Sequence, residues 1–206
     1  MDQQTRVQEL LTQAKTGDID ASTLAGELAT LQRQVDAQAE MIRSLKRDTI
    51  TDPLTGALNR RGFEIELNKA LANARRHHRL SALLFVDMDN FKHINDTHGH
   101  HAGDEALCHV AELLQANIRQ TDVLARVGGD EFSIILNDVR SVEDAEKRAR
   151  LLSDFISSSP VRFEDETIQI QASVGTQSFQ AEDDMIDVIA RADEAMYAAK
   201  RAGELT

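Results

Sequence analysis

The stretch Arg126–Phe132, RVGGDEF, decides the fold, because two short apolar runs meet at it. Val123–Val127 leads into the paired glycines and Phe132–Leu136 follows them, and both runs have the length and composition of strands. Adjacent glycines tolerate the positive φ angles that a tight hairpin turn requires. The sequence therefore predicts a β-hairpin whose tip carries two acidic side chains, Asp130 and Glu131.

A third acidic residue ends another strand upstream of this hairpin. Leu80–Val86 is a largely apolar run of strand length, which indicates a buried strand, and Asp87 follows it directly. Hard divalent cations need oxygen ligands that converge from separate elements of structure. Asp87, Asp130 and Glu131 are therefore candidates for a site of metal-assisted phosphoryl chemistry, although their spacing alone is also typical of ordinary solvated acids.

Helices and strands alternate on both sides of these acids. Apolar residues at helical spacing predict helices around Phe63–Ala74, Leu107–Leu114, Val142–Ile156 and Met185–Ala202, with a strand pair ending in TIQIQASVG at Gly175. The pattern is that of one α/β (α+β) domain.

The N-terminal quarter of the chain has a different periodicity. After a short predicted helix over residues 7–14, apolar residues recur in strict 4,3 alternation, which is the heptad seam of a coiled coil with one polar member. The seam consists of Leu24, Leu28, Leu31, Val35, Gln38, Ile42 and Leu45. A dimerising stalk is the favoured interpretation, and a helix packed on its own domain is the alternative. Pro53 then marks a boundary, so we expect a stalk over residues 1–48 and a globular domain over 49–206.

Composition limits the partners and the compartment. The chain of 206 residues is 41% apolar and 28% charged, enough to bury a core, and its net charge of −12 disfavours nucleic acid as a partner. The lone Cys108 excludes an internal disulfide, and no stretch reaches the length of a membrane span. We therefore expect a cytoplasmic protein.

Five motifs in a fixed order give the chain a family resemblance. RVGGDEF at Arg126–Phe132 resembles the signature of GGDEF-domain diguanylate cyclases. The other four are DPLTGALNRRGF (52–63), FVDMDNFKHINDTHGHHAGD (85–104), ASVG (172–175) and RADEAMYAAKRAG (191–203). The resemblance implies a palm-like domain, related to nucleotide cyclase and polymerase palms, with a central, mostly antiparallel sheet flanked by helices. It also implies condensation of two GTP into cyclic di-GMP by a homodimer.

The resemblance further assigns roles to single residues. It implies that two Mg²⁺ or Mn²⁺ ions are held by Asp87, the carbonyl of Met88, Asp130 and Glu131. Asp130, Glu131 and Lys92 would be catalytic, with Lys92 beside the phosphates. The expected substrate contacts are Asn95 and Asp104 for guanine, together with His100, Lys92, Lys200, Gly128 and Gly129.

One regulatory motif and one departure also follow from the resemblance. Arg119 and Asp122, in RQTD, match the family's inhibitory site, at which bound cyclic di-GMP shuts the enzyme down, although RxxD is also a common ion pair at helix ends. Relatives commonly carry an arginine after the last glycine of the final motif, where this chain has Glu204.

Three other readings compete with an active cyclase. A non-catalytic receptor for GTP or cyclic di-GMP could signal through the stalk, but the acids, Lys92 and Asn95 are intact. A cyclase acting on one triphosphate would not need RQTD or Asn95 with Asp104. Finally, His98, His100 and His101 could bind a transition metal, but a solvated turn after the strand is the simpler interpretation.

Overall fold

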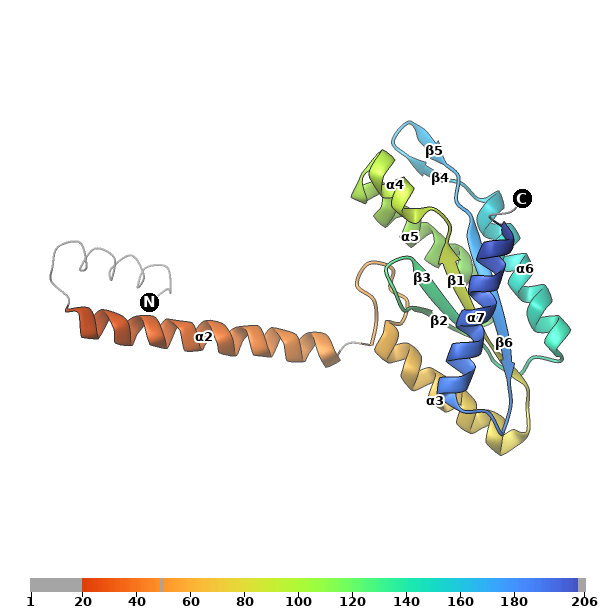
Figure 1. The fold of residues 1–206 in the computed structure, drawn as a ribbon, viewed down its shortest axis with the longest axis horizontal. Helices are drawn as coiled ribbons and strands as arrows, with labels where there is room; N and C mark the ends of the chain where they lie inside the picture. Colours follow the sequence, from red (N-terminus) through yellow and green to blue (C-terminus); the bar gives the residue numbers. More distant parts are fainter. Residues whose placement is uncertain (1–19, 49, 204–206) are drawn as a thin grey trace. The chain divides into compact units, whose positions relative to one another are not determined.

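The computed structural model describes residues 20–48 and 50–203. These residues form two units, the helix α2 (Ala21–Asp48) and a globular unit that begins at Ile50 (Figure 1). The short helix expected over residues 7–14 and the departure at Glu204 lie outside the described residues.

A four-stranded antiparallel sheet forms the centre of the globular unit (Figure 1). Its strands are β1 (Ser81–Met88), β2 (Val123–Arg126), β3 (Glu131–Leu136) and β6 (Ala172–Phe179), in the order β2-β3-β1-β6. The expected hairpin is confirmed, since β2 pairs with β3 from Val123 opposite Ile135 to Arg126 opposite Phe132. The antiparallel α/β fold class is likewise confirmed.

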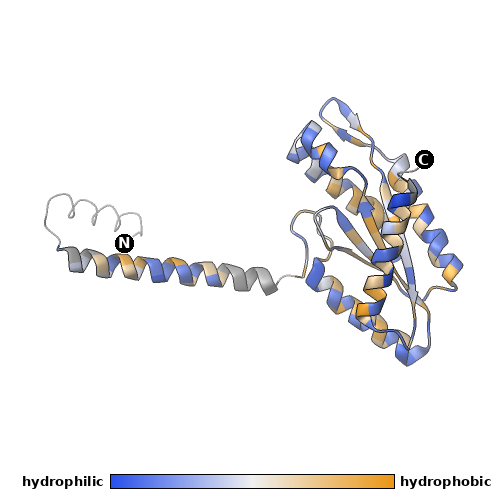
Figure 2. Cartoon of the chain, viewed as in Figure 1, coloured by the Kyte–Doolittle hydropathy of each residue, from blue (hydrophilic) through white to orange (hydrophobic). Residues whose placement is uncertain are grey.

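Helices cover both faces of the sheet. On one face, α5 (His100–Ala116) and α6 (Val142–Ser158) pack with alternate residues of β1 such as Leu84 and Val86. On the other face, α3 (Arg60–His77) and α7 (Met185–Gly203) pack with Leu83 and Phe85. Figure 2 shows apolar residues concentrated on the strands and on the helix sides that meet them. All eight residues of β1 are buried, which makes it the most enclosed strand described.

Helix α7 approaches β6 unusually closely at one glycine. A Cβ atom added at Gly175 would overlap the backbone N and Cα of Met196 and lie 2.7 Å from its Cβ. Because odd-numbered residues of β6 share a face, Gly175 identifies that face as the one covered by α7. The absence of a side chain at Gly175, the last residue of ASVG, therefore sets how closely α7 packs on β6.

The histidine-rich segment differs from the expected solvated turn. Residues Phe91–His98 form a separate helix, α4, and α5 begins at His100, so only Gly99, with φ of 85°, connects them. His98 forms an ion pair of 2.6 Å with Glu166 of the hairpin β4–β5 (Val161–Phe163 and Glu166–Ile168). The turn was predicted because α4 buries only Ile94, too few apolar residues to show helical periodicity.

Helix α2 exposes several apolar side chains among those described, which do not include Leu24, Ile42 and Leu45 of the seam. Leu28 and Val35 of the heptad seam are each 56% exposed, and Gln38 is exposed as well. A stripe of this kind on a single helix has no apolar surface of its own to cover it. No helix among the described residues is both long and apolar enough to cross a membrane.

Candidate active site

Strand register brings two of the predicted acids together. Asp87, near the end of β1, pairs directly with Glu131, the first residue of β3, so both side chains project from the α3/α7 face of the sheet. Asp130 occupies the turn just before Glu131, and its carbonyl accepts a 3.1 Å hydrogen bond from the backbone N–H of Met88. Asp87, Met88, Asp130 and Glu131 therefore form one corner at the end of β1.

Hydrogen bonds from Arg126 hold the signature turn in place. Arg126 donates through Nη2 and Nε to the carbonyl of Gly129, at 2.6 and 3.2 Å, and through Nη1 to the carboxylate of Asp52 at 3.2 Å. Burial would raise the pKa of Asp52, but hydrogen bonds from Thr55 and Arg126 outweigh it and lower that pKa. The motif at Asp52 thus buttresses the acidic turn.

Neither glycine of the signature has the positive φ expected for the hairpin turn, so the reason for glycine differs from the prediction. At Gly128 a Cβ would overlap Oε2 of Glu131, so the glycine leaves room for that carboxylate. At Gly129 no atom lies within 4 Å of the added Cβ. Space for Glu131 is therefore built into the turn by Gly128 alone.

Negative charge accumulates at this corner and is partly balanced by α7. Burial raises the pKa of Glu131, and the nearby carboxylates of Asp87, Asp130 and Asp193 raise it further. Lys200 Nζ lies 2.5 Å from Oδ1 of Asp87, and this hydrogen bond raises the pKa of the lysine. The site therefore has more anionic groups than its own residues neutralise, which favours a bound cation.

The donor set fits a hard divalent metal ion. Asp87, Asp130 and Glu131 supply carboxylate oxygens, and Met88 supplies a backbone carbonyl. Within the described ranges, no three His, Cys, Asp or Glu side chains converge closely enough to hold a metal by themselves.

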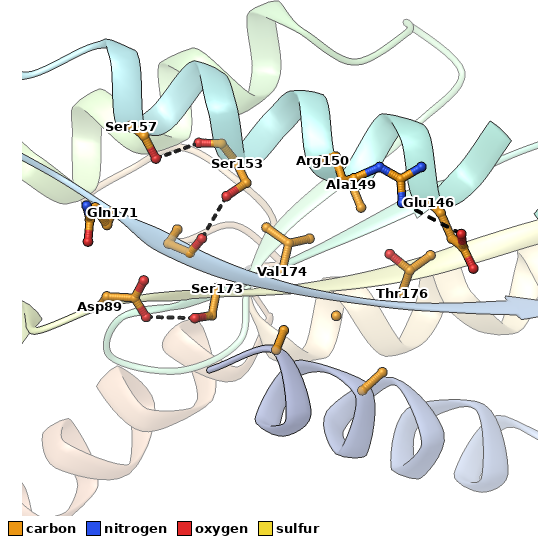
Figure 3. Close-up of a pocket in the computed structure, with 14 residues that line it drawn as sticks. Asp89, Glu146, Ala149, Arg150, Ser153, Ser157, Gln171, Ser173, Val174 and Thr176 are labelled. Carbon is orange, nitrogen blue, oxygen red and sulfur yellow. Dashed lines mark hydrogen bonds and ion pairs between the residues drawn. The ribbon is translucent and has the colours of Figure 1, made fainter. Parts of the chain in front are cut away.

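Asp89, the second acid of the DMD sequence, points elsewhere. Its Oδ1 accepts a 2.8 Å hydrogen bond from Ser173 Oγ, and it lines a pocket between α6, β6 and α7 (Figure 3). This bond to β6 anchors the turn that leads from β1 into α4.

Helices α4 and α5 carry the residues predicted to contact guanine and phosphate. A Cβ on Gly103 would overlap Oδ1 of Asn95, so the amide of Asn95 lies against the residue that precedes Asp104. Lys92, His100 and Asp104 are exposed at the surface of these helices. The structure thus places Asn95 next to the α5 turn that carries Asp104.

The predicted inhibitory pair is not an ion pair between side chains. The buried carboxylate of Asp122 accepts hydrogen bonds from the backbone N–H groups of Arg119 and Asn137, at 2.9 and 3.1 Å. The exposed guanidinium of Arg119 forms no hydrogen bond or ion pair within the part of the chain that the structure describes. Asp122 therefore shapes the loop, and Arg119 stays available for a ligand.

Arg119 and Asp122 line a pocket of about 260 Å³, whose other lining residues the sequence did not predict. Arg140, Lys147 and Arg148 line the same pocket and make its surface cationic. In the sequence these three residues read as solvated charges on a loop and a helix, so no pattern there distinguished them. Arg119 and Asp122 precede β2 and the acidic turn follows it, so the strand lies between them and that turn.

The sheet order, the paired acids and the surrounding helices define an antiparallel α/β domain with a candidate metal corner. A family model described as "Diguanylate cyclase, GGDEF domain" matches residues 49–206. The chain belongs to the GGDEF family.

Curated relatives and solved structures agree with this assignment. The chain is 34% identical over 203 residues to the diguanylate cyclase DgcP of Pseudomonas aeruginosa and 36% identical over 186 residues to TpbB of the same organism. These matches cover 98% and 88% of the chain but only 30% and 41% of the two relatives.

Two solved structures match most of the chain. The Pseudomonas aeruginosa diguanylate cyclase SiaD, in complex with its activator SiaC, matches with a TM-score of 0.71 at 31% identity, over 97% of this chain and 76% of SiaD. The coiled coil and GGDEF domain of DgcB from Caulobacter crescentus, in complex with c-di-GMP, matches with a TM-score of 0.70 at 30% identity, over 88% of this chain and 96% of that chain.

Proposed function

We propose that this chain is a diguanylate cyclase that condenses two GTP molecules into cyclic di-GMP and two pyrophosphates. The observation that carries the proposal is the corner where Asp87 lies opposite Glu131 and Met88 is hydrogen-bonded to Asp130. The activity is also supported by DgcP and TpbB, which are diguanylate cyclases and of whose length this chain spans less than half.

The residues at the corner have complementary roles in this proposal. Asp87, Asp130, Glu131 and the Met88 carbonyl hold divalent metal, Mg²⁺ or Mn²⁺, with two ions per site. Bound metal would lower the pKa of the 3′-hydroxyl and neutralise charge at the α-phosphate and pyrophosphate. Lys200 exchanges its contact with Asp87 for a phosphate, since its ammonium already lies at this corner.

Substrate selection falls to α4 and α5 in the proposal. Asn95 and Asp104 hydrogen-bond the guanine edge, and His100 contacts the nucleotide. Lys92, on the first turn of α4, stabilises negative charge that develops on the phosphates. The support for this arrangement is the packing of Asn95 against Gly103, which puts Asn95 beside the turn of α5 that carries Asp104.

Ring closure requires two copies of the chain. Each domain holds one GTP, so each 3′-hydroxyl must meet the α-phosphate bound by a second domain. The exposed heptad seam of α2 supports pairing through a parallel coiled coil, which raises the effective concentration of the facing domain.

Product inhibition is the proposed role of the Arg119 pocket. The planar guanidinium of Arg119 suits bidentate binding of phosphate or a guanine edge, and Arg140, Lys147 and Arg148 add positive charge for a dianionic product. The support is the free guanidinium of Arg119 and the cationic lining.

The decisive experiment incubates the full chain with GTP and Mg²⁺ and separates the products by chromatography. We expect cyclic di-GMP from the wild-type protein and none above background from Asp130→Ala, which should fold normally because Asp130 is a turn residue outside the core. Wild-type protein that binds cyclic di-GMP but forms none would identify a receptor instead. Near-wild-type turnover by Asp130→Ala would refute the metal assignment.

A further inference from the structure

A pocket of about 510 Å³ lies between α3 and α7, on the face of the sheet opposite α5. Its floor is apolar and consists of Phe63, Phe85 and Met196, with the two rings 6.2 Å apart. These three side chains are nearly buried, and Ile189 of α7 closes one side. A cavity of this size and apolar lining is typical of small-molecule sites.

The mouth of this pocket is anionic. Glu64, Glu131 and Asp193 line it, and the single cationic lining residue is Arg60. Arg60 already donates through Nε to the carbonyl of Val127 at 3.1 Å, so part of its guanidinium is committed to the signature turn. Carboxylates thus outnumber guanidinium groups three to one.

We infer that the pocket between α3 and α7 binds a small amphiphilic cation, in which an apolar aromatic body carries an ammonium group. The body rests on Phe63, Phe85 and Ile189, and the ammonium lies at the mouth between Glu131 and Asp193. Charge complementarity selects this class, because an anionic amphiphile such as a fatty acid or a nucleotide would meet three carboxylates at the entrance.

The pocket borders the metal corner through Glu131, which belongs to both. If the proposed cyclase function holds, an ammonium at Glu131 competes with metal for that carboxylate. The ligand would then raise the Mg²⁺ concentration needed for turnover. This pocket is separate from the Arg119 pocket, since none of their lining residues is shared.

Binding is tested first without GTP or metal, using tryptamine as the probe and the full chain in the presence of a chelator. The protein contains no tryptophan, so indole fluorescence anisotropy reports the probe alone. We expect saturable binding that is about tenfold weaker for indole-3-acetate, which has the same ring and the opposite charge. Equal binding of the two probes, or no saturation, would overturn the inference.

Two α7 variants form a matched pair. Ala190 lines the pocket and Ala198 does not, and both are exposed on the same helix. Ala190→Phe should weaken tryptamine binding about tenfold, whereas Ala198→Phe should change it less than about twofold. Equal effects of both changes would show that the probe binds elsewhere.

Asp193→Asn tests the charge without filling the pocket. An exposed carboxylate contributes modestly, so we expect tryptamine to bind about two- to fivefold more weakly, with indole-3-acetate gaining affinity. Unchanged affinities for both probes would contradict the inference. Tryptamine that binds as expected to a protein without cyclase activity would leave the pocket established and refute only the proposed function.

Discussion

The close packing of α7 on β6 makes Gly175→Ala a sharp test of the fold. The added methyl group would overlap backbone atoms of Met196, which cannot rotate away as a flexible side chain would. Restoring carbon contacts of about 3.5 Å would require α7 to retreat by more than about 1 Å. Overpacking of this kind costs about 3 kcal/mol at the upper end of its usual range.

A smaller effect opposes this cost. Replacing glycine by alanine restricts the unfolded chain and contributes roughly 0.5–1 kcal/mol of stability. The net loss of about 2 kcal/mol corresponds to a fall in Tm of about 4–8 °C for a domain of this size.

Thermal unfolding followed by circular dichroism measures this shift. Gly26→Ala on α2 is the control, because no atom lies within 4 Å of its added Cβ, and its Tm should not fall. A Gly175→Ala protein with a Tm within about 2 °C of the wild type would refute the inferred depth of α7 packing.

Three further predictions concern charge, regulation and assembly. The pKa of Glu131 is raised in the folded protein, so its protonated form stabilises the fold below about pH 4.5, and this contribution is lost as the pH rises through the folded pKa. Glu131→Gln should therefore raise the Tm at pH 7 in the presence of a chelator, and it should reduce the further rise in Tm that Mg²⁺ gives the wild type. A lower Tm of Glu131→Gln than of the wild type in chelator would show that burial and the neighbouring carboxylates do not destabilise the ionised Glu131. Arg119→Ala should keep its initial rate and raise the inhibition constant for cyclic di-GMP at least about tenfold, and an unchanged constant in product-inhibition kinetics would leave RQTD a structural motif. A chain starting at Ile50 should lose specific activity on dilution sooner than the full chain, as checked by sedimentation and initial rates, and identical dilution curves with a monomeric full chain would rule out a dimerising stalk.

The core of the fold could be predicted from the sequence because its signals are local. The glycine pair with an apolar run on each side indicates the β2–β3 hairpin, and the largely apolar run Leu80–Val86 indicates β1 as a buried strand. Their antiparallel register then brings Asp87 opposite Glu131, a contact that spacing could suggest but not establish.

Other parts of the site depend on distant contacts that no local pattern reveals. The eight-residue helix α4 buries only Ile94, and His98 finds its partner Glu166 on a hairpin far along the chain. Arg140, Lys147 and Arg148 join Arg119 only because α6 packs against the end of α5, where Arg148 donates to the carbonyl of Asn117. The pairing of Lys200 with Asp87 likewise follows from the depth of α7, which Gly175 controls.

The hydrogen bond from Met88 N–H to the Asp130 carbonyl has a dynamic consequence. It joins the end of the most enclosed strand to the acidic turn, so neither can open without breaking the bond to the other. The Met88 amide should therefore exchange its hydrogen with solvent as slowly as the core of β1, although it lies at the edge of an accessible site. We therefore expect the corner formed by Asp87, Met88 and Asp130 to open only together with β1, and not by local unfolding of the turn.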